Sequence, residues 1–187
     1  MRFPLVLRIS AGFALFACFL AIGARWMSAE SPDSTAISNL LAQAKSQAVV
    51  AENDAAILES YTHPGSAWET HAAQLRTIAE HVNALAETVK QLNGLREEGS
   101  PWQQEAIFQI NPLLRHQVDQ INATIKHLND NKDRIHMPAY RNYTAAGHEL
   151  ATRTATAVSD FVEYGKARSK AGSLEQELEL PSSGTGK

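Results

Sequence analysis

Residues 68–92, WETHAAQLRTIAEHVNALAETVKQL, decide the fold class of this chain. One stripe along this stretch has side chains alternately three and four positions apart, and all but its histidine are large and apolar: Trp68, His71, Leu75, Ile78, Val82, Leu85, Val89 and Leu92. Such a repeat predicts an α-helix with a narrow apolar face, as in a bundle or coiled coil. Burying seven such side chains stabilises a fold by roughly 10–20 kcal/mol before chain entropy is subtracted, so the stripe needs partner helices.

Three more segments supply those partners. Residues 34–60 carry a stripe that is rich in alanine: Ile37, Leu41, Ala44, Ala48, Ala51, Ala55 and Leu58. Residues 101–129 carry Ile107, Leu114, Val118, Ile121, Ile125 and Leu128. Residues 138–170 carry Tyr140, Tyr143, Gly147, Leu150, Thr154, Ala157, Phe161 and Tyr164. With residues 67–93, these segments predict four helices of similar length.

Proline and glycine mark the ends of these helices. The prolines at 32, 64, 101 and 138 each precede or open a helix, and Gly94 is suited to a left-handed cap after the second. Ser100 and Gln103 have the spacing of a capping box. Pro112 is expected to bend the third helix without dividing it, because the apolar stripe continues on both sides.

Short loops between helices of similar length favour antiparallel neighbours. The predicted fold is therefore all-α, an antiparallel up-down-up-down four-helix bundle over residues 30–172. Residues 173–187 are expected to add a short amphipathic extension and a flexible tail that is rich in serine and glycine.

Residues 1–29 have the pattern of a signal peptide or N-terminal membrane anchor. Arg2 and Arg8 precede an apolar run from Ile9 to Ala24. Leu15-Phe16-Ala17-Cys18 also resembles a bacterial lipobox, with phenylalanine where a small residue is usual. All three interpretations predict export of residues 30–187, to the periplasm or the medium. Membrane contact is expected only through residues 9–27, if they are not cleaved.

Charge and cysteine content narrow the range of functions. The net charge is −3, and loss of Arg2 and Arg8 with a leader leaves 15 basic against 20 acidic side chains, or −5. With no basic stripe, such a surface is not expected to bind nucleic acid. Cys18 is the only cysteine, so the remaining chain has no disulfide, no thiol nucleophile, no cysteine-bound zinc and no covalent haem.

Histidines are the candidate metal ligands. In the predicted topology, His63, His71, His127 and His136 gather at one end of the bundle, with Met137 and three tyrosines: Tyr61, Tyr140 and Tyr143. Imidazoles in such a group are able to hold zinc or copper. Alternatively, these are ordinary histidines at helix ends, with His71 packed in the seam.

A second candidate is a haem site inside the bundle. His71 or His148 would ligate the iron, and Gly147 would leave room for a flat ring. The alternative is that Gly147 and the alanines of residues 34–60 only permit close packing. No histidine has glutamate three residues before it, and no phosphate-binding loop or nucleophile motif occurs, so no catalytic residue is predicted.

These observations predict a non-enzymatic exported protein that binds or scaffolds another protein through its outer helical faces. The alternative is a carrier of a small molecule, haem, zinc or copper, in the interior or at the histidine-rich end. A sensor module is a third class, and there the resemblance to the bundles of bacterial chemoreceptors is one of architecture only.

Overall fold

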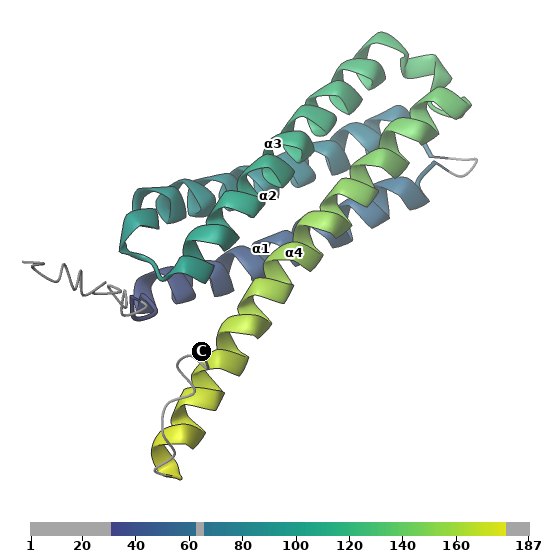
Figure 1. The fold of residues 1–187 in the computed structure, drawn as a ribbon. Helices are drawn as coiled ribbons and strands as arrows, with labels where there is room; N and C mark the ends of the chain where they lie inside the picture. The colour runs from purple at the N-terminus through teal and green to yellow at the C-terminus, as the bar shows by residue number, and fades with distance from the viewer. Residues whose placement is uncertain (1–30, 63–65, 179–187) are drawn as a thin grey trace, which may run out of the picture.

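The computed structural model describes residues 31–62 and 66–178, and these contain four α-helices and no β-strand (Figure 1). Helix α1 spans Thr35–Ser60, α2 Trp68–Gly94, α3 Pro101–Asp130 and α4 Pro138–Glu177. Two short 3₁₀ turns, η1 (Arg96–Glu98) and η2 (Lys132–Arg134), precede α3 and α4. The all-helical class and the four helices agree with the prediction.

Several predicted features lie outside the described residues. They are the signal peptide or anchor at 1–29, the lipobox-like Cys18, His63 and the last nine residues of the tail.

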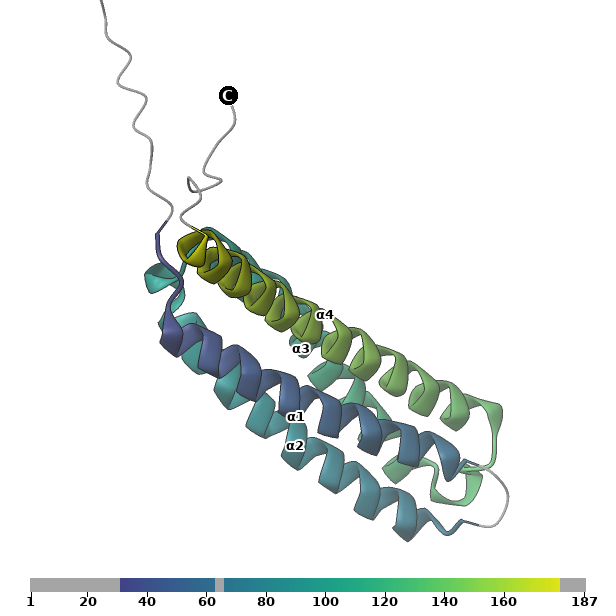
Figure 2. The same cartoon turned by 90° about the horizontal axis from the view of Figure 1, so that it is seen from below.

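The four helices pack around one apolar core. Helix α1 contacts α2 and α4, and α3 contacts the same two helices (Figures 1 and 2). The core takes side chains from all four helices, including Leu41, Leu85, Ile107 and Val158.

The stripes of α1 and α2 face this core as predicted. All seven stripe positions of α1 are buried, and α2 buries its stripe from His71 to Leu92. Trp68, the first stripe residue of α2, is half-buried, and the Lys132 ammonium lies 4.3 Å from its ring centroid. The buried alanines of α1 leave room for neighbouring helices to approach closely.

The predicted core face of α4 is wrong by about one position. Tyr140 and Thr154 are buried as expected, but the other buried residues are small side chains next to the predicted stripe: Thr144, Ala151, Ala155, Val158 and Val162. Tyr143, Leu150 and Phe161 are half-buried at the edges of the interface. Small side chains fit between closely packed helices, whereas the Tyr143 and Phe161 rings stay at the rim of the interface.

The helix boundaries include two further corrections. Gly94 is the last residue of α2 and has no left-handed φ. The residue that caps the helix is Leu95, with φ −100°. Helix α4 was expected to end near Lys170 but continues to Glu177. Pro112 does not divide α3; it and Phe108 lie on the exposed side, where water can bond the carbonyl that lacks an amide partner.

Helix α4 therefore extends past the other three helices. It has 40 residues, against 26, 27 and 30 for α1, α2 and α3. Figure 1 shows its last turns projecting beyond the ends of α1 and α3. We call residues 170–178 the free end of α4.

Candidate functional site

Five rings pack together where α1 and α3 end and α2 and α4 begin. This aromatic cluster consists of Tyr61, His71, His127, Tyr140 and Tyr143. The His71 ring lies 5.2 Å from that of Tyr140 and 6.0 Å from that of Tyr61, both edge to face. The His127 ring lies 4.6 Å from that of Tyr143. The order of the helices predicts these residues at one end of the molecule, and all five do meet there.

His71 is a buried, hydrogen-bonded member of this cluster. Neither its ring nor that of Tyr140 is accessible to solvent, and its Nδ1 lies 3.1 Å from the Tyr140 hydroxyl. Burial lowers the pKa of His71, and the Tyr61 backbone opposes this effect more weakly. Burial also raises the pKa of Tyr140. Both side chains are therefore neutral near pH 7 and hold the ends of α2 and α4 together.

The other candidate metal ligands are not brought to His71 as a group. His127 is half-buried against the tyrosine rings, and His136 is exposed in the turn before α4. Within residues 31–62 and 66–178, no cluster of three or more His, Cys, Asp or Glu side chains is arranged to hold a metal ion.

The interior beside Gly147 has room for very little. A cavity of about 20 Å³ lies there, and its lining includes Gly147, Ala55, Leu75 and Gln117. That volume fits about one water molecule. The Gln117 Oε1 atom is buried without a hydrogen-bond partner among the described residues, so a water in this cavity would have an acceptor.

His148, the candidate axial ligand, faces a carboxylate on α1. Its Nδ1 lies 2.6 Å from Glu59 Oε2, and both side chains are partly exposed. A similar pair joins α1 and α2, with His81 Nδ1 2.5 Å from Asp54 Oδ2. The sequence did not reveal these pairs, because their partners are on different helices and depend on helix rotation.

A groove of about 410 Å³ lies at the opposite end, between the start of α1, Trp102 of α3 and the later part of α4. The Trp102 Nε1–H donates to Asp33 Oδ1 at 2.6 Å. Gly165 makes room for the ring, since a Cβ atom there would lie 2.7 Å from Trp102 Cη2. This groove was not predicted from the sequence, where its one local signal is Gly165, a glycine within a helical pattern.

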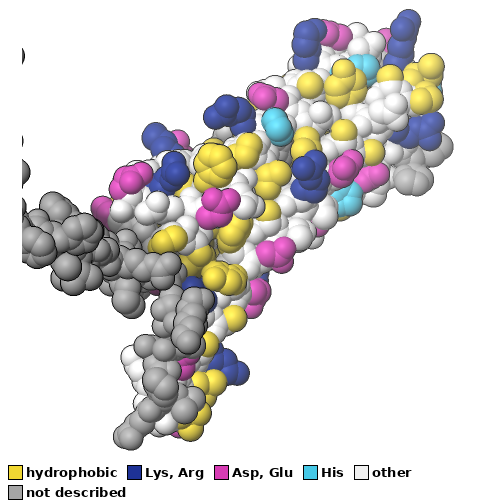
Figure 3. Space-filling model, in the orientation of Figure 1, with side chains coloured by type: hydrophobic (Ala, Val, Ile, Leu, Met, Phe, Trp, Pro, Cys, Tyr) yellow, Lys and Arg dark blue, Asp and Glu magenta, His cyan; other side chains and the backbone are white. Residues whose placement is uncertain are grey.

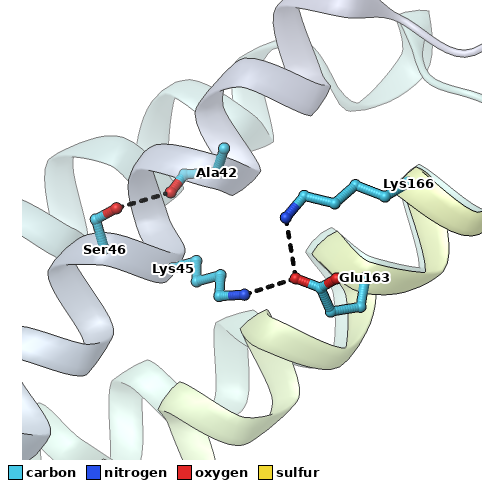
Figure 4. A network of polar contacts seen from close by, with 5 residues as sticks. All are labelled: Ala42, Lys45, Ser46, Glu163 and Lys166. Atoms are coloured by element: carbon cyan, nitrogen blue, oxygen red, sulfur yellow. Dashed lines mark hydrogen bonds and ion pairs between the residues drawn. The ribbon is translucent and has the colours of Figure 1, made fainter.

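An ion pair ties the same part of α4 to α1, and a second lysine of α4 joins it (Figure 4). Glu163 Oε1 lies 2.7 Å from Lys45 Nζ and 3.0 Å from Lys166 Nζ. Hydrogen bonds from Lys45 and Lys166 lower the pKa of the Glu163 carboxyl. Ser46, one residue after Lys45, bonds the Ala42 carbonyl within α1. Helix α4 is thus fixed to α1 just before its free end begins.

From Tyr164 onward, α4 exposes apolar side chains. Tyr164 is 47% exposed, Leu174 45% and Leu178 62%. Figure 3 shows hydrophobic side chains over this projecting end. A single exposed leucine is ordinary, but a row along an unsupported helix is typical of a contact surface.

No family model, curated protein or solved structure matches this chain. None of the helices that the structure describes is both long enough and apolar enough to cross a membrane.

Proposed function

We propose that this chain is an exported, non-enzymatic binding or scaffolding protein with the up-down-up-down topology of a four-helix bundle. The contacts between α1 and α4 support that topology. Lys45, early in α1, contacts Glu163, late in α4, whereas Glu59 contacts His148. Residue numbers thus rise along one helix as they fall along the other, as antiparallel neighbours require.

One observation carries the binding role: the interior is filled, while an apolar row on α4 is exposed. The two histidines that were candidate haem ligands have protein partners: His71 Nδ1 contacts the Tyr140 hydroxyl, and His148 Nδ1 contacts Glu59 Oε2. The exposed leucines of the free end contribute nothing to the core. Partner contact through an outer face accounts for both features.

A ligand panel tests this role against that of a carrier. Purified protein is heated with haem, Zn²⁺ or Cu²⁺, alongside His71→Ala and His148→Ala variants with the same additions. We expect no ligand to raise the melting temperature. A stabilisation that disappears in either variant contradicts the scaffold role and supports a carrier.

Export is proposed on the basis of residues 1–29 and has its own test. The mass of the mature protein recovered from the periplasm and the medium distinguishes a cleaved leader, a retained anchor and a lipid on Cys18. Recovery of the full-length, unmodified chain from the cytoplasm alone contradicts export.

A further inference from the structure

From residue 167 through its free end, α4 has an apolar stripe on the side away from the core. Ala167, Ala171, Leu174 and Leu178 follow the alternating spacing of a coiled-coil seam, and all four are exposed. Tyr164, one step earlier in the same spacing, instead packs edge to face on Trp102, with 5.5 Å between the ring centroids. About half a turn around the helix, the opposite face has four small side chains and one glutamine: Gly165, Ser169, Gly172, Ser173 and Gln176. The bundle core therefore stops at Val162, while a second apolar face begins on the other side.

We propose that this stripe pairs with the same stripe of a second copy, the two helices running antiparallel. This inference rests on the proposed binding function and names its partner. A two-fold axis between Gly172 and Ser173 brings residues whose numbers sum to about 345 opposite each other. The assembly stops at a dimer, because each copy uses the same surface to bind the other and no such surface is left over.

Side-chain sizes fit this antiparallel register. Ala171 lies opposite Leu174 of the second copy, and Ala167 lies opposite Leu178. Each layer then combines a small side chain with a large one, which keeps the distance between the helices even. A parallel pair would instead place leucine against leucine and alanine against alanine.

The charged residues beside the stripe also fit an antiparallel pair. The first half carries Arg168 and Lys170, and the second half carries Glu175 and Glu177. In an antiparallel pair, residues that flank one side of the seam face the same flank of the partner helix. Lys170 then faces Glu177, and Arg168 faces Glu175, each twice because of the two-fold axis. Opposite charges at all four places favour this partner and register.

Charge reversal tests the partner. The full exported chain is compared by sedimentation equilibrium with two double variants, Arg168→Glu with Lys170→Glu and Glu175→Lys with Glu177→Lys. We expect the unmodified chain to dimerise reversibly and each double variant to dimerise at least about 10-fold more weakly. An equimolar mixture of the two variants should recover dimerisation, because opposite charges then face each other again. An unmodified chain that stays monomeric at about 1 mM overturns the proposal.

Cross-linking tests the direction. In a Cys18→Ser background, Ala167→Cys and Leu178→Cys chains should form a disulfide with each other under mild oxidation. Neither should form one alone, since two copies of residue 178 would lie about 16 Å apart along the axis. Self-linked Leu178→Cys overturns the antiparallel register. Circular dichroism of every variant should match the unmodified chain. Failure of dimerisation overturns this inference alone, whereas only the ligand panel can overturn the non-carrier role.

Discussion

The side-chain amide of Gln103 bonds both backbone groups of Ser34. Its Oε1 accepts from Ser34 N at 2.9 Å, and its Nε2 donates to Ser34 O at 2.9 Å. The same amide also accepts from Ser100 N at 3.1 Å and donates to Ser38 Oγ at 3.0 Å. Gln103 is completely buried, so one side chain joins the first turns of α1 and α3.

Replacing Gln103 should therefore be costly. Gln103→Leu keeps the side-chain size but leaves the backbone groups of Ser34 and Ser100 without this partner, so we expect the free energy of unfolding to fall by about 2–4 kcal/mol. Gln104→Leu is the control, because Gln104 is only half-buried and bonds only Gly99 O; its loss should stay near 1 kcal/mol. Urea denaturation measures both. Equal losses would mean that the Gln103 bonds contribute little.

Two glycines should respond to alanine in opposite directions. At Gly165 the new methyl group meets the rigid Trp102 ring, so Gly165→Ala should destabilise the protein by about 1–3 kcal/mol. Nothing lies within 4 Å of a Cβ at Gly94, which has ordinary helical geometry, so Gly94→Ala should stabilise by up to about 1 kcal/mol. Thermal unfolding of both variants checks the signs, and a stable Gly165→Ala protein would contradict the close approach of Trp102.

The buried imidazole of His71 predicts a pH dependence. Its pKa is lower in the folded protein, so below about pH 6.5 the unfolded chain binds a proton that the folded chain does not. Stability should be complete above that pH and fall as the pH drops, by at most about 1.4 kcal/mol per unit from this residue.

Two variants separate the charge from the hydrogen bond. His71→Phe should flatten the dependence of the unfolding free energy on pH between about 7.5 and 5.5. Tyr140→Phe should lower stability by about 1–2 kcal/mol but keep that dependence, because His71 stays buried. If His71→Phe leaves the slope unchanged, His71 is protonated equally in both states.

Asn93 and Asn111 form a reciprocal amide pair. Each Nδ2 donates to the other Oδ1 at 2.8 Å, which joins α2 to α3 one residue before Pro112. A double-mutant cycle with Asn93→Ala and Asn111→Ala should give a coupling energy of about 0.5–1.5 kcal/mol. Strictly additive losses would show that the two amides act separately.

The local pattern predicted most of the fold. Apolar spacing located all four helices, and in α1 and α2 it also identified the buried face, because there one stripe is more apolar than its neighbours. In α4 two adjacent stripes have similar apolar content. Size then favoured the stripe with the smaller side chains: Ala151 and Ala155 are buried, whereas Leu150 and Phe161 stay half-buried.

The site was less accessible to prediction. That His71, His127 and Tyr140 share one end followed from the order of the helices, but how each ring is used depends on helix rotation. The Glu59–His148 pair and the Trp102–Asp33 bond join residues 89 and 69 positions apart. No pattern within a single helix reveals such contacts.

The position of the helix ends also determines how the molecule resists mechanical load. The first turn of α1 and the last turn of α4 lie at the same end of the structure (Figure 2). A pulling force on residues 31 and 178 would therefore unzip α1 from α4, loading one turn at a time instead of shearing the whole interface. The Lys45–Glu163 contact would break before the Glu59–His148 contact, and rupture would need only the small force that holds a single turn.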